Sequence, residues 1–543
     1  MQGCVPISRL AGRDILLAGL LCAAVFSYAH WHGLTNPYVS NDDVRQQVFW
    51  MQRYSDPQLY PSDPLADYAR LYVPSGVKAL YWLASPVCGA VEFSKVLTGG
   101  LFVLLGICLW GIGASLGGRG LGWTTLGVFW LMPTFLYNMS GGISRSFASP
   151  LLALYFLCWL RGNAKWMGLT LLLQAICIPY ICILCTAACL LAAAAGRLRP
   201  ALAPPFPTKF WHLGLVILAA ALIWAMSRGF DAAGYGPLVS KADMIGRPEF
   251  TAQGRLELYP QPGLFMDAVY YPFERIGFFL EGGLGLGIAT LALILGLAFY
   301  SGRKACWRVI LARSRPLICL LAVSLGLYVL ARMVLLKLFV PDRYVSYTLY
   351  MIYCLGLAVC FHAGLRRIAA NRWLAAAAIL IAAVAGGLRL HGQGLFDYSR
   401  DAGLYAAVRQ TPKDSLIAGN PNLMDNVLTF GQRKVFVAYK LAHPWSKGWW
   451  GFVEPRLEGF FKAYYAGDPD EVRDFCRENK IDFLVVDPGD FTPACLANHP
   501  FFAPFDAYIK SLTQGRTSFA LLSAKDFPYV DVGRGLRLID MRQ

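Results

Sequence analysis

Charged residues are scarce in this chain. Asp, Glu, Lys and Arg make up 15% of its 543 residues, whereas 56% are hydrophobic. Because soluble domains carry about a quarter of charged residues, this composition excludes a string of soluble domains and indicates a membrane protein with several spanning segments. The sequence also lacks an internal repeat, which argues against a transporter built from repeated halves.

Acidic residues are almost missing from the short connectors between the hydrophobic segments. Lysine and arginine gather there at 9–13, 119, 161–165, 197–209, 303–315 and 366–372, with Asp14 as the one acidic companion. This one-sided placement is the positive-inside pattern of cytoplasmic loops. The net charge of +16 therefore reports membrane topology, and a nucleic-acid partner is not expected.

A cleavage site of small residues does not follow the first hydrophobic segment, so we expect an uncleaved anchor there. Similar segments recur as far as residue 388, each long enough, or nearly so, to cross about 30 Å of hydrocarbon as a helix. We expect about eleven spans, at 15–34, 96–117, 121–139, 148–160, 166–179, 180–196, 210–227, 283–300, 316–336, 346–365 and 373–388.

Residues 74–91 are apolar enough to suggest a twelfth span, but a crossing there would break the pattern of the downstream basic connectors. We therefore expect an interfacial helix, with Lys78 snorkelling and with Tyr81 and Trp82 at headgroup depth. The N-terminus and basic connectors are then cytoplasmic. The external segments are 35–95, 140–147, 228–282, 338–345 and 389–543.

The hydrophobic segments stop at residue 389, and the tail mixes charges, prolines and short β-type runs. We expect strands at 414–419, 430–438 and 481–487 and a helix at 468–479. The predicted fold class is thus a polytopic α-helical membrane protein, with a transmembrane domain at 1–388 and a C-terminal external (periplasmic) α/β domain at 389–543. Cys476 and Cys495 are alone in this tail, and an oxidising compartment would allow them to pair.

Aromatic side chains cluster in the tail at His443, Trp445, Trp449 and Trp450. Such rings stack on sugar rings in some proteins, and they also serve as amphipathic anchors. Docking of the tail against the membrane face and sugar stacking both remain open from the sequence.

Two adjacent carboxylates, Asp42 and Asp43, lie about eight residues beyond the first hydrophobic segment and precede a predicted amphipathic helix at 44–51. In one interpretation, 40–43 is a capping box, in which Asp43 satisfies the helix N-terminus and Asp42 complements the helix dipole. In the other, one carboxylate accepts a proton from an incoming hydroxyl or ligates a divalent cation such as Mg²⁺ or Mn²⁺.

Four basic residues are candidates for binding a phosphate. Arg145 stands among glycines and serines in the short external connector 140–147, where it forms an anion cradle or snorkels to the headgroups. Arg332 and Lys337 lie toward the external end of a span, and Arg343 follows in the Pro-Asp-Arg-Tyr run at 341–344. Cations at this depth in the membrane either bind a lipid phosphate or anchor the span among the headgroups.

At these residues the chain resembles the GT-C superfamily of membrane glycosyltransferases, which take a sugar from a polyprenyl-phosphate carrier. The acidic pair after the first span, the Tyr-Trp interfacial helix, the 341–344 loop and the C-terminal external domain carry the resemblance. It implies that Asp42 or Asp43 serves as base or metal ligand. Many members hold a second acid in the next external loop, where this chain has Arg145 and no acid. Phosphate stabilisation by Arg145, Arg343 and Arg332 is the natural substitute.

The resemblance thus implies an inverting glycosyltransferase of the EC 2.4 class in a bacterial inner membrane. It would move a sugar from a polyprenyl-phosphate donor to an envelope lipid, glycan or protein acceptor. Asp42 or Asp43 would take the acceptor's proton while arginines stabilise the departing phosphate without metal. Two other classes remain open, a flippase or transporter of lipid-linked glycans and a non-catalytic subunit of an envelope polysaccharide system.

Overall fold

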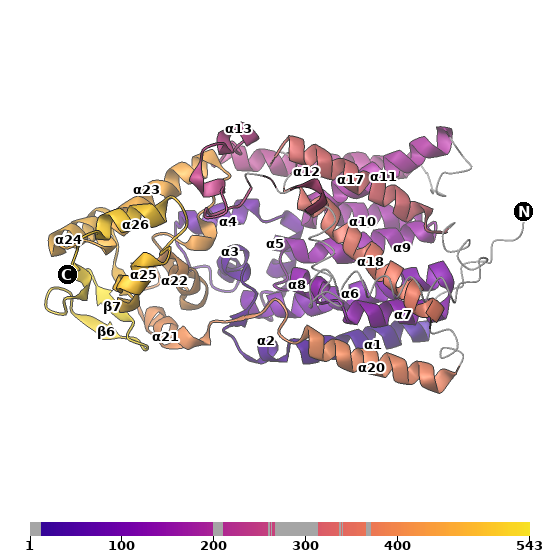
Figure 1. Ribbon diagram of the computed structural model, residues 1–543, viewed down its shortest axis with the longest axis horizontal. Coiled ribbons are helices and arrows are strands. Elements are labelled where there is room, and N and C mark those ends of the chain that lie inside the picture. The colour runs from indigo at the N-terminus through magenta and orange to yellow at the C-terminus, as the bar shows by residue number, and fades with distance from the viewer. Residues whose placement is uncertain are drawn as a thin grey trace, which may run out of the picture.

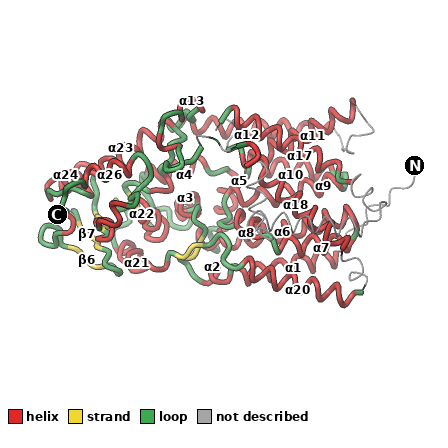
Figure 2. The backbone as a smooth tube through the Cα atoms, viewed as in Figure 1, coloured by secondary structure: helices red, strands yellow, loops and turns green. Residues whose placement is uncertain are grey.

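The computed structural model describes residues 12–198, 210–258, 261, 263–266, 313–335, 338, 340–364 and 371–542. Its helices form an elongated bundle, and the C-terminal domain lies at one end of that bundle (Figure 1). Helices dominate the chain, and its strands lie in the C-terminal domain and at the junction with the bundle (Figure 2).

Apolar helices build the bundle. They are α1 Gly12–Ala29, α6 Ala90–Gly117, α7 Arg119–Trp130, α8 Pro133–Met139, α9 Ala148–Leu160, α10 Ala164–Cys177, α11 Pro179–Leu198, α12 Phe210–Ala232, α17 Arg315–Met333, α18 Asp342–Gly364 and α20 Arg372–Leu390. Within the described residues, six helices are long and apolar enough to cross a membrane, namely α1, α6, α11, α17, α18 and α20. The chain is therefore a polytopic α-helical membrane protein. The expected span 283–300 lies outside the described residues, and the total of about eleven stays a prediction.

A proline divides the bundle where we expected one continuous span. The expected span 121–139 is two helices, because α7 ends at Trp130 and α8 begins at Pro133. Proline lacks an N–H group and disfavours helical geometry in the preceding residue, and Met132 accordingly has extended backbone. Pro179 begins α11, close to the expected boundary between the spans 166–179 and 180–196.

A short helix, α5 (Ser75–Ala84), occupies the ambiguous stretch at 74–91. Its ten residues would span roughly 15 Å, half the thickness of the hydrocarbon core, so α5 cannot cross alone. Trp82 is exposed, as expected of an interfacial side chain, but Tyr81 is buried and donates a hydrogen bond to the carbonyl of Gly142 at 3.2 Å. The expected headgroup position of Tyr81 is therefore wrong.

The two ends of the bundle differ in what they carry. At the end away from the C-terminal domain, Arg119 forms an ion pair with Asp14 at 2.7 Å, and Arg313 donates to the carbonyl of Ser115 at 3.1 Å. Three of the basic connectors identified in the sequence therefore meet at one end. The other end holds the loop after α1, the α8–α9 connector and the C-terminal domain (Figure 1).

Short elements form the loop between α1 and α6, and a two-stranded sheet ties this loop to the C-terminal domain. The loop contains α2 Trp31–Thr35, β1 Val39–Ser40, α3 Val44–Gln47, the 3₁₀ helix η1 Phe49–Tyr54, α4 Pro64–Tyr72 and α5. β1 pairs antiparallel with β2 (Phe396–Asp397), which follows α20. Each strand has two residues, so this contact fixes position without forming a large core.

A five-stranded mixed sheet runs through the C-terminal domain in the order β4-β3-β5-β7-β6. Its strands are β3 Leu416–Gly419, β4 Lys434–Val435, β5 Phe483–Val486, β6 Tyr529–Asp531 and β7 Arg537–Asp540. β3 is parallel to β4 and β5, whereas β7 is antiparallel to β5 and β6. Every residue of β5 is buried, which accounts for its unbroken apolar run.

Helices complete this domain: α21 Ala402–Gln410, α22 Pro421–Asn426, α23 Lys447–Tyr464, α24 Pro469–Glu478, α25 Pro493–Ala497 and α26 Phe505–Thr513. The expected helix at 468–479 is α24, capped by Asp468. The expected strand at 430–438 is wrong in length, because β4 is an edge strand whose two residues pair with Leu416 and Ile417. A π-helical turn at Val427–Gly431 precedes it.

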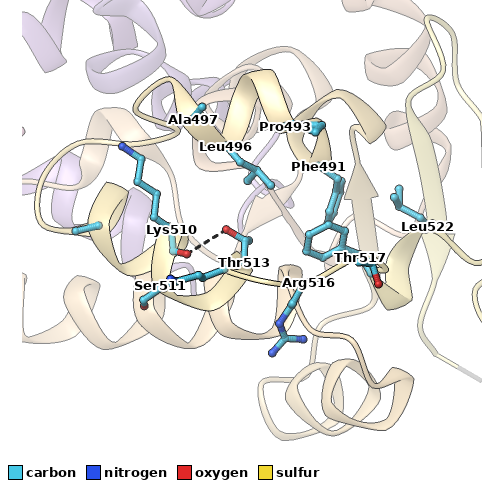
Figure 3. A pocket seen from close by; sticks show the side chains of 13 residues that line it. Phe491, Pro493, Leu496, Ala497, Lys510, Ser511, Thr513, Arg516, Thr517 and Leu522 are labelled. Atoms are coloured by element: carbon cyan, nitrogen blue, oxygen red, sulfur yellow. Dashed lines mark hydrogen bonds between the residues drawn. The ribbon is translucent and has the colours of Figure 1, made fainter.

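An open pocket of about 920 Å³ lies on the surface of this domain, between α26 and the segment that contains α25 (Figure 3). Phe491, Leu496 and Phe519 give it an apolar wall. Near it, Cys495 is partly exposed on α25, whereas Cys476 is buried on α24, and both are free thiols. The pairing that the sequence allowed is therefore not formed.

Candidate functional site

Asp42 and Asp43 lie at the junction between the bundle and the C-terminal domain, directly after β1 and before α3. The interpretation of Asp43 as a capping side chain is wrong. Asp43 occupies the N-cap position of α3, but no side chain makes a capping hydrogen bond, and α3 has four residues. The carboxylates bind cationic side chains instead, one from the same loop and two from other parts of the chain.

Arg145 reaches Asp43 from the connector between α8 and α9. It lies on a 3₁₀ turn, η2 (Ser144–Phe147), and its Nη1 is 2.6 Å from Asp43 Oδ2. Its Nη2 donates to Asn41 Oδ1 at 3.1 Å. The predicted neighbourhood of the acidic pair and Arg145 is thus present in the structure.

Two glycines allow the connector to approach so closely. Gly141 and Gly142 have positive φ values of 100° and 57°. A Cβ on Gly141 would lie 3.0 Å from the Asn41 side chain, and one on Gly142 would lie 2.5 Å from the carbonyl of Ser94. Glycine is the residue that fits both positions without strain.

Asp42 receives donors from both domains. Arg45, one turn along the same loop, contacts its Oδ1, and Lys440 of the C-terminal domain contacts its Oδ2. Tyr398 donates its hydroxyl to Oδ1 at 3.1 Å. Burial alone would raise the pKa of Asp42, but Lys440 and Arg45 outweigh burial and hold that pKa below 3.8, its ordinary value.

Lys440 joins the two carboxylates, since its Nζ also lies 3.5 Å from Asp43 Oδ1. It follows β4 and belongs to the 3₁₀ turn η7 (Tyr439–Leu441), which holds it at the domain junction. Its backbone N–H donates to Asp425 at 2.9 Å. The C-terminal domain therefore completes the charged cluster.

Arg45 connects this cluster to a second, buried carboxyl group. Its guanidinium donates to Asn426 at 2.8 Å, lies 3.8 Å from Asp425 and stacks 4.3 Å above the ring of Tyr398. Burial raises the pKa of Asp425 to about 6, against the opposing field of Arg45. We call Asp42, Asp43, Arg45, Arg145 and Lys440 the junction cluster.

The junction cluster does not suit a divalent cation in this arrangement. Each oxygen of Asp42 and Asp43 already contacts a cationic side chain. A metal ion would have to displace at least one of these cations and would be repelled by the others. The described residues contain no group of three or more His, Cys, Asp or Glu side chains placed to hold a metal.

The other predicted phosphate ligands lie on other elements. Arg343, at the start of α18, donates to the hydroxyl of Tyr347 at 3.2 Å and lies 3.9 Å from Asp342. Arg332, near the end of α17, donates to the hydroxyl of Tyr328 at 3.0 Å. Within the described part of the chain, neither contacts Asp42 or Asp43, and Lys337 lies outside it. The structure brings together Arg145 and the acidic pair, not the full predicted set.

The aromatic group of the tail packs against α4 of the first loop. Trp449 stacks on Tyr68 with ring centroids 3.9 Å apart, and Trp449 is fully buried. His443 is also fully buried, hydrogen-bonded to Tyr68 at 3.0 Å and to Gln46, and stacked on Trp445. These rings dock the two domains together, and Trp449 offers no face to a sugar.

Sequence reasoning missed Lys440, Arg45 and Tyr398. Arg45 had a local signal, because it lies three residues after Asp42 at helical spacing. Lys440 and Tyr398 come from separate segments of the tail, and nothing in their local sequence indicates that they meet the first loop.

No protein-family model matches the chain, and no curated protein does. Its fold is similar to that of the oligosaccharyltransferase of Archaeoglobus fulgidus in its apo form, with a TM-score of 0.52 at 12% identity over 90% of this chain and 71% of that chain.

Two other solved structures are similar at lower scores. They are the arabinofuranosyltransferase AftD from mycobacteria (TM-score 0.48, 17% identity, 88% of this chain and 37% of that chain) and ArnT from Cupriavidus metallidurans (TM-score 0.43, 10% identity, 97% of both chains). The likeness to the oligosaccharyltransferase is one of fold. It confirms that this chain has the GT-C fold that the sequence resembles.

Proposed function

We propose that this chain is an inverting membrane glycosyltransferase, which moves a sugar from a polyprenyl-phosphate carrier to an acceptor of the cell envelope. The reaction takes place at the end of the bundle that carries the C-terminal domain, which we assign to the periplasm. The opposite end, with Arg119, Arg313 and Asp14, is then cytoplasmic.

The junction cluster carries this proposal. Two carboxylates lie against three cationic side chains, which come from the first loop, the α8–α9 connector and the C-terminal domain. Ion pairs at a domain junction are also compatible with a structural role. The GT-C fold, shared with an oligosaccharyltransferase, favours the catalytic one, because that enzyme's name gives glycosyl transfer as its activity.

Asp43 is the better candidate for the general base. Asp42 is held by Arg45, Lys440 and Tyr398, and its pKa is lowered, so it is a poor base. Asp43 has one short contact, with Arg145, and one longer contact of 3.5 Å with Lys440. An acceptor hydroxyl that displaces Lys440 from Asp43 gains a carboxylate oxygen to receive its proton.

The sugar is then transferred in a single displacement step. The acceptor oxygen forms a bond to the anomeric carbon as its proton passes to Asp43, and the bond from that carbon to the carrier's phosphate oxygen breaks. The electron pair stays on the phosphate. Arg145 and Lys440 lie beside Asp43 and are placed to stabilise this charge. In this scheme Arg343 and Arg332 guide the carrier lipid, as their sequence positions suggest.

Turnover by the purified protein tests the proposal. The full chain in lipid nanodiscs is incubated with labelled polyprenyl-phosphate sugars and envelope acceptors, and transfer of label is measured. We expect transfer by the wild type and none by the double variant Asp42→Asn, Asp43→Asn. Transport or assembly functions that need no proton acceptor should survive both substitutions. Absence of turnover across common sugars would contradict the proposal.

A further inference from the structure

A small cavity of about 160 Å³ lies where three parts of the chain meet. Residues 37–59 of the first loop form one side, the start of α6 at 89–92 forms the second, and the C-terminal domain forms the third through 409 and 429–432. The junction cluster is not part of its lining. We call this cavity the junction crevice.

The lining of the junction crevice mixes donors, acceptors and aromatic faces. Gln52 and Gln432 contribute amides, Glu92 a carboxylate and Arg409 a guanidinium. Tyr38 and Phe430 add rings whose centroids lie 5.6 Å apart at 85°. Such a lining provides hydrogen bonds in both senses together with apolar ring faces, which is the combination that the hydroxyls and C–H faces of a sugar require.

The charges of the crevice are close to balance. Asp56 and Glu92 are its acidic side chains, and Arg409 is its cation. At the rim, Lys413 pairs with Asp56 at 2.6 Å, which makes two charges of each sign. A phosphate or another anion would find no excess of positive charge here. The balance favours a neutral ligand.

The floor of the crevice is fixed by contacts between the domains. Gln52 is 8% exposed, donates to the carbonyl of Thr429 at 3.0 Å and accepts from the amide of Gln432. Arg409 uses its Nε to bind the carbonyl of Phe430 at 2.7 Å, and its Nη groups make no hydrogen bond among the described residues, so both can bind a ligand. Binding would therefore cost little reorganisation of these side chains.

The crevice is separated from the reacting carboxylates by aromatic rings. Phe430 lines it, the ring of Tyr398 lies 5.8 Å from Phe430, and the Tyr398 hydroxyl donates to Asp42. A ligand in the crevice is thus near Asp42 and Asp43 but cannot be the group that reacts there.

We propose that the junction crevice binds a neutral sugar unit of the acceptor, one or more units away from the hydroxyl that attacks the donor. The acceptor is then a glycan of several sugars rather than a lipid or a peptide. This inference rests on the proposed function and adds the class of acceptor to it.

Binding measured without donor tests the inference. The probes are short neutral oligosaccharides, released from the envelope polysaccharide of the source cells and labelled at the reducing end, and the protein is the full chain in nanodiscs. We expect saturable binding that weakens about tenfold in Glu92→Gln and in Arg409→Gln, because each loses a charged hydrogen bond to the sugar. Glu478→Gln and Arg477→Gln, exposed on α24, are the matched controls and should bind like the wild type.

The variant Asp43→Asn separates this inference from the proposed function. It should bind the oligosaccharides normally and fail in transfer. If the double variant Asp42→Asn, Asp43→Asn transfers sugar at the wild-type rate, the proposed function is wrong. If Asp43→Asn fails as expected while Glu92→Gln and Arg409→Gln bind the oligosaccharides as tightly as the controls, or if no oligosaccharide binds, the crevice is not an acceptor site.

Discussion

Arg145 Nη1 lies 2.6 Å from Asp43 Oδ2, although the arginine comes from the connector between α8 and α9 and the aspartate from the loop after α1. Asn41 strengthens the link, because its Oδ1 accepts from Arg145 and from the backbone N–H of Asp43. Groups that share partners in this way act as a unit, so their substitutions should not be additive.

The substitution Asp43→Asn should reduce kcat by about 10²- to 10⁴-fold, the usual contribution of a general base. An amide keeps the size of the side chain and cannot accept the proton. The KM for the donor should change little, because the donor does not bind Asp43 in our scheme. Steady-state transfer assays in nanodiscs measure both constants.

Asp397→Asn is the matched control for this variant. Asp397 lies on β2, close in the fold to Asp43, and is paired with His32 in an exposed contact of 3.3 Å. The transfer activity of Asp397→Asn should equal that of the wild type. A wild-type rate in Asp43→Asn together with a collapsed rate in Asp42→Asn would assign the base to Asp42.

Arg145→Gln should lower kcat for transfer by about 10²- to 10³-fold, the effect of removing one donor from a developing oxyanion. Arg145→Lys should restore little of the lost kcat, because an ammonium group cannot contact Asn41 and Asp43 in the geometry of the planar guanidinium. Arg119→Gln, which removes an ion pair at the opposite end of the bundle, should leave kcat unchanged. Equal losses in Arg145→Gln and Arg119→Gln would point to general destabilisation.

The sequence predicted the bundle well because its signals are local. Runs of apolar residues marked the helices, and the one-sided basic connectors predicted that Arg119 and the region of Asp14 share an end, as their ion pair confirms. The break at Pro133 was missed, although proline chemistry predicts it, because the apolar run continues through this site. The boundary at Pro179 agrees with the predicted spans 166–179 and 180–196.

The site was predictable in part. Asp42, Asp43 and Arg145 stood out as isolated charges in short loops near apolar segments. Lys440 could not be identified, because its role depends on the docking of the C-terminal domain, and docking depends on rings such as Trp449 and Tyr68 that are far apart in the sequence. Nonlocal packing of this kind leaves no periodic pattern in a single sequence.

Lys440→Met should make the protein more sensitive to acid. In the folded state the pKa of Asp42 lies below 3.8, so its ion pairs stabilise the fold above that pH, and this stabilisation is lost as the pH falls through the lowered value. Without Lys440, burial raises the pKa of Asp42, and the loss begins at higher pH. Thermal unfolding in detergent between pH 3 and 7 measures the shift.

Lys413→Met is the control for that experiment. Lys413 also bridges the two domains, through its pair with Asp56, but both side chains are well exposed. Exposed pairs contribute about 0–1 kcal/mol, so its acid transition should stay near that of the wild type. Identical acid transitions in Lys440→Met and the wild type would contradict the assigned coupling.

His443→Gln should remove a source of acid instability between pH 6.5 and 5. Burial lowers the pKa of His443 well below 6.5, helped by the positive charge of Arg255. Below pH 6.5 this histidine is protonated in the unfolded chain but stays neutral in the folded chain. The free energy of unfolding therefore decreases by up to about 1.4 kcal/mol for each unit by which the pH falls. Glutamine can still bond Gln46 and Tyr68. The difference in unfolding free energy between pH 7.5 and 5 should shrink in this variant and stay unchanged in His32→Gln, whose ring is exposed.

Trp449→Ala should loosen the C-terminal domain from the first loop. Trp449 is fully buried, stacks on Tyr68 and donates its Nε1–H to the carbonyl of Leu441 at 2.8 Å. Its truncation should lower the unfolding free energy by about 3–5 kcal/mol.

Because Leu441 adjoins Lys440, the Trp449→Ala variant should also lose transfer activity. It should become cleavable near 439–441 by a protease that does not cut the wild type. Trp31→Ala, a truncation of a ring that is 63% exposed, should show neither effect. Wild-type activity in Trp449→Ala would mean that the junction cluster assembles without this docking contact.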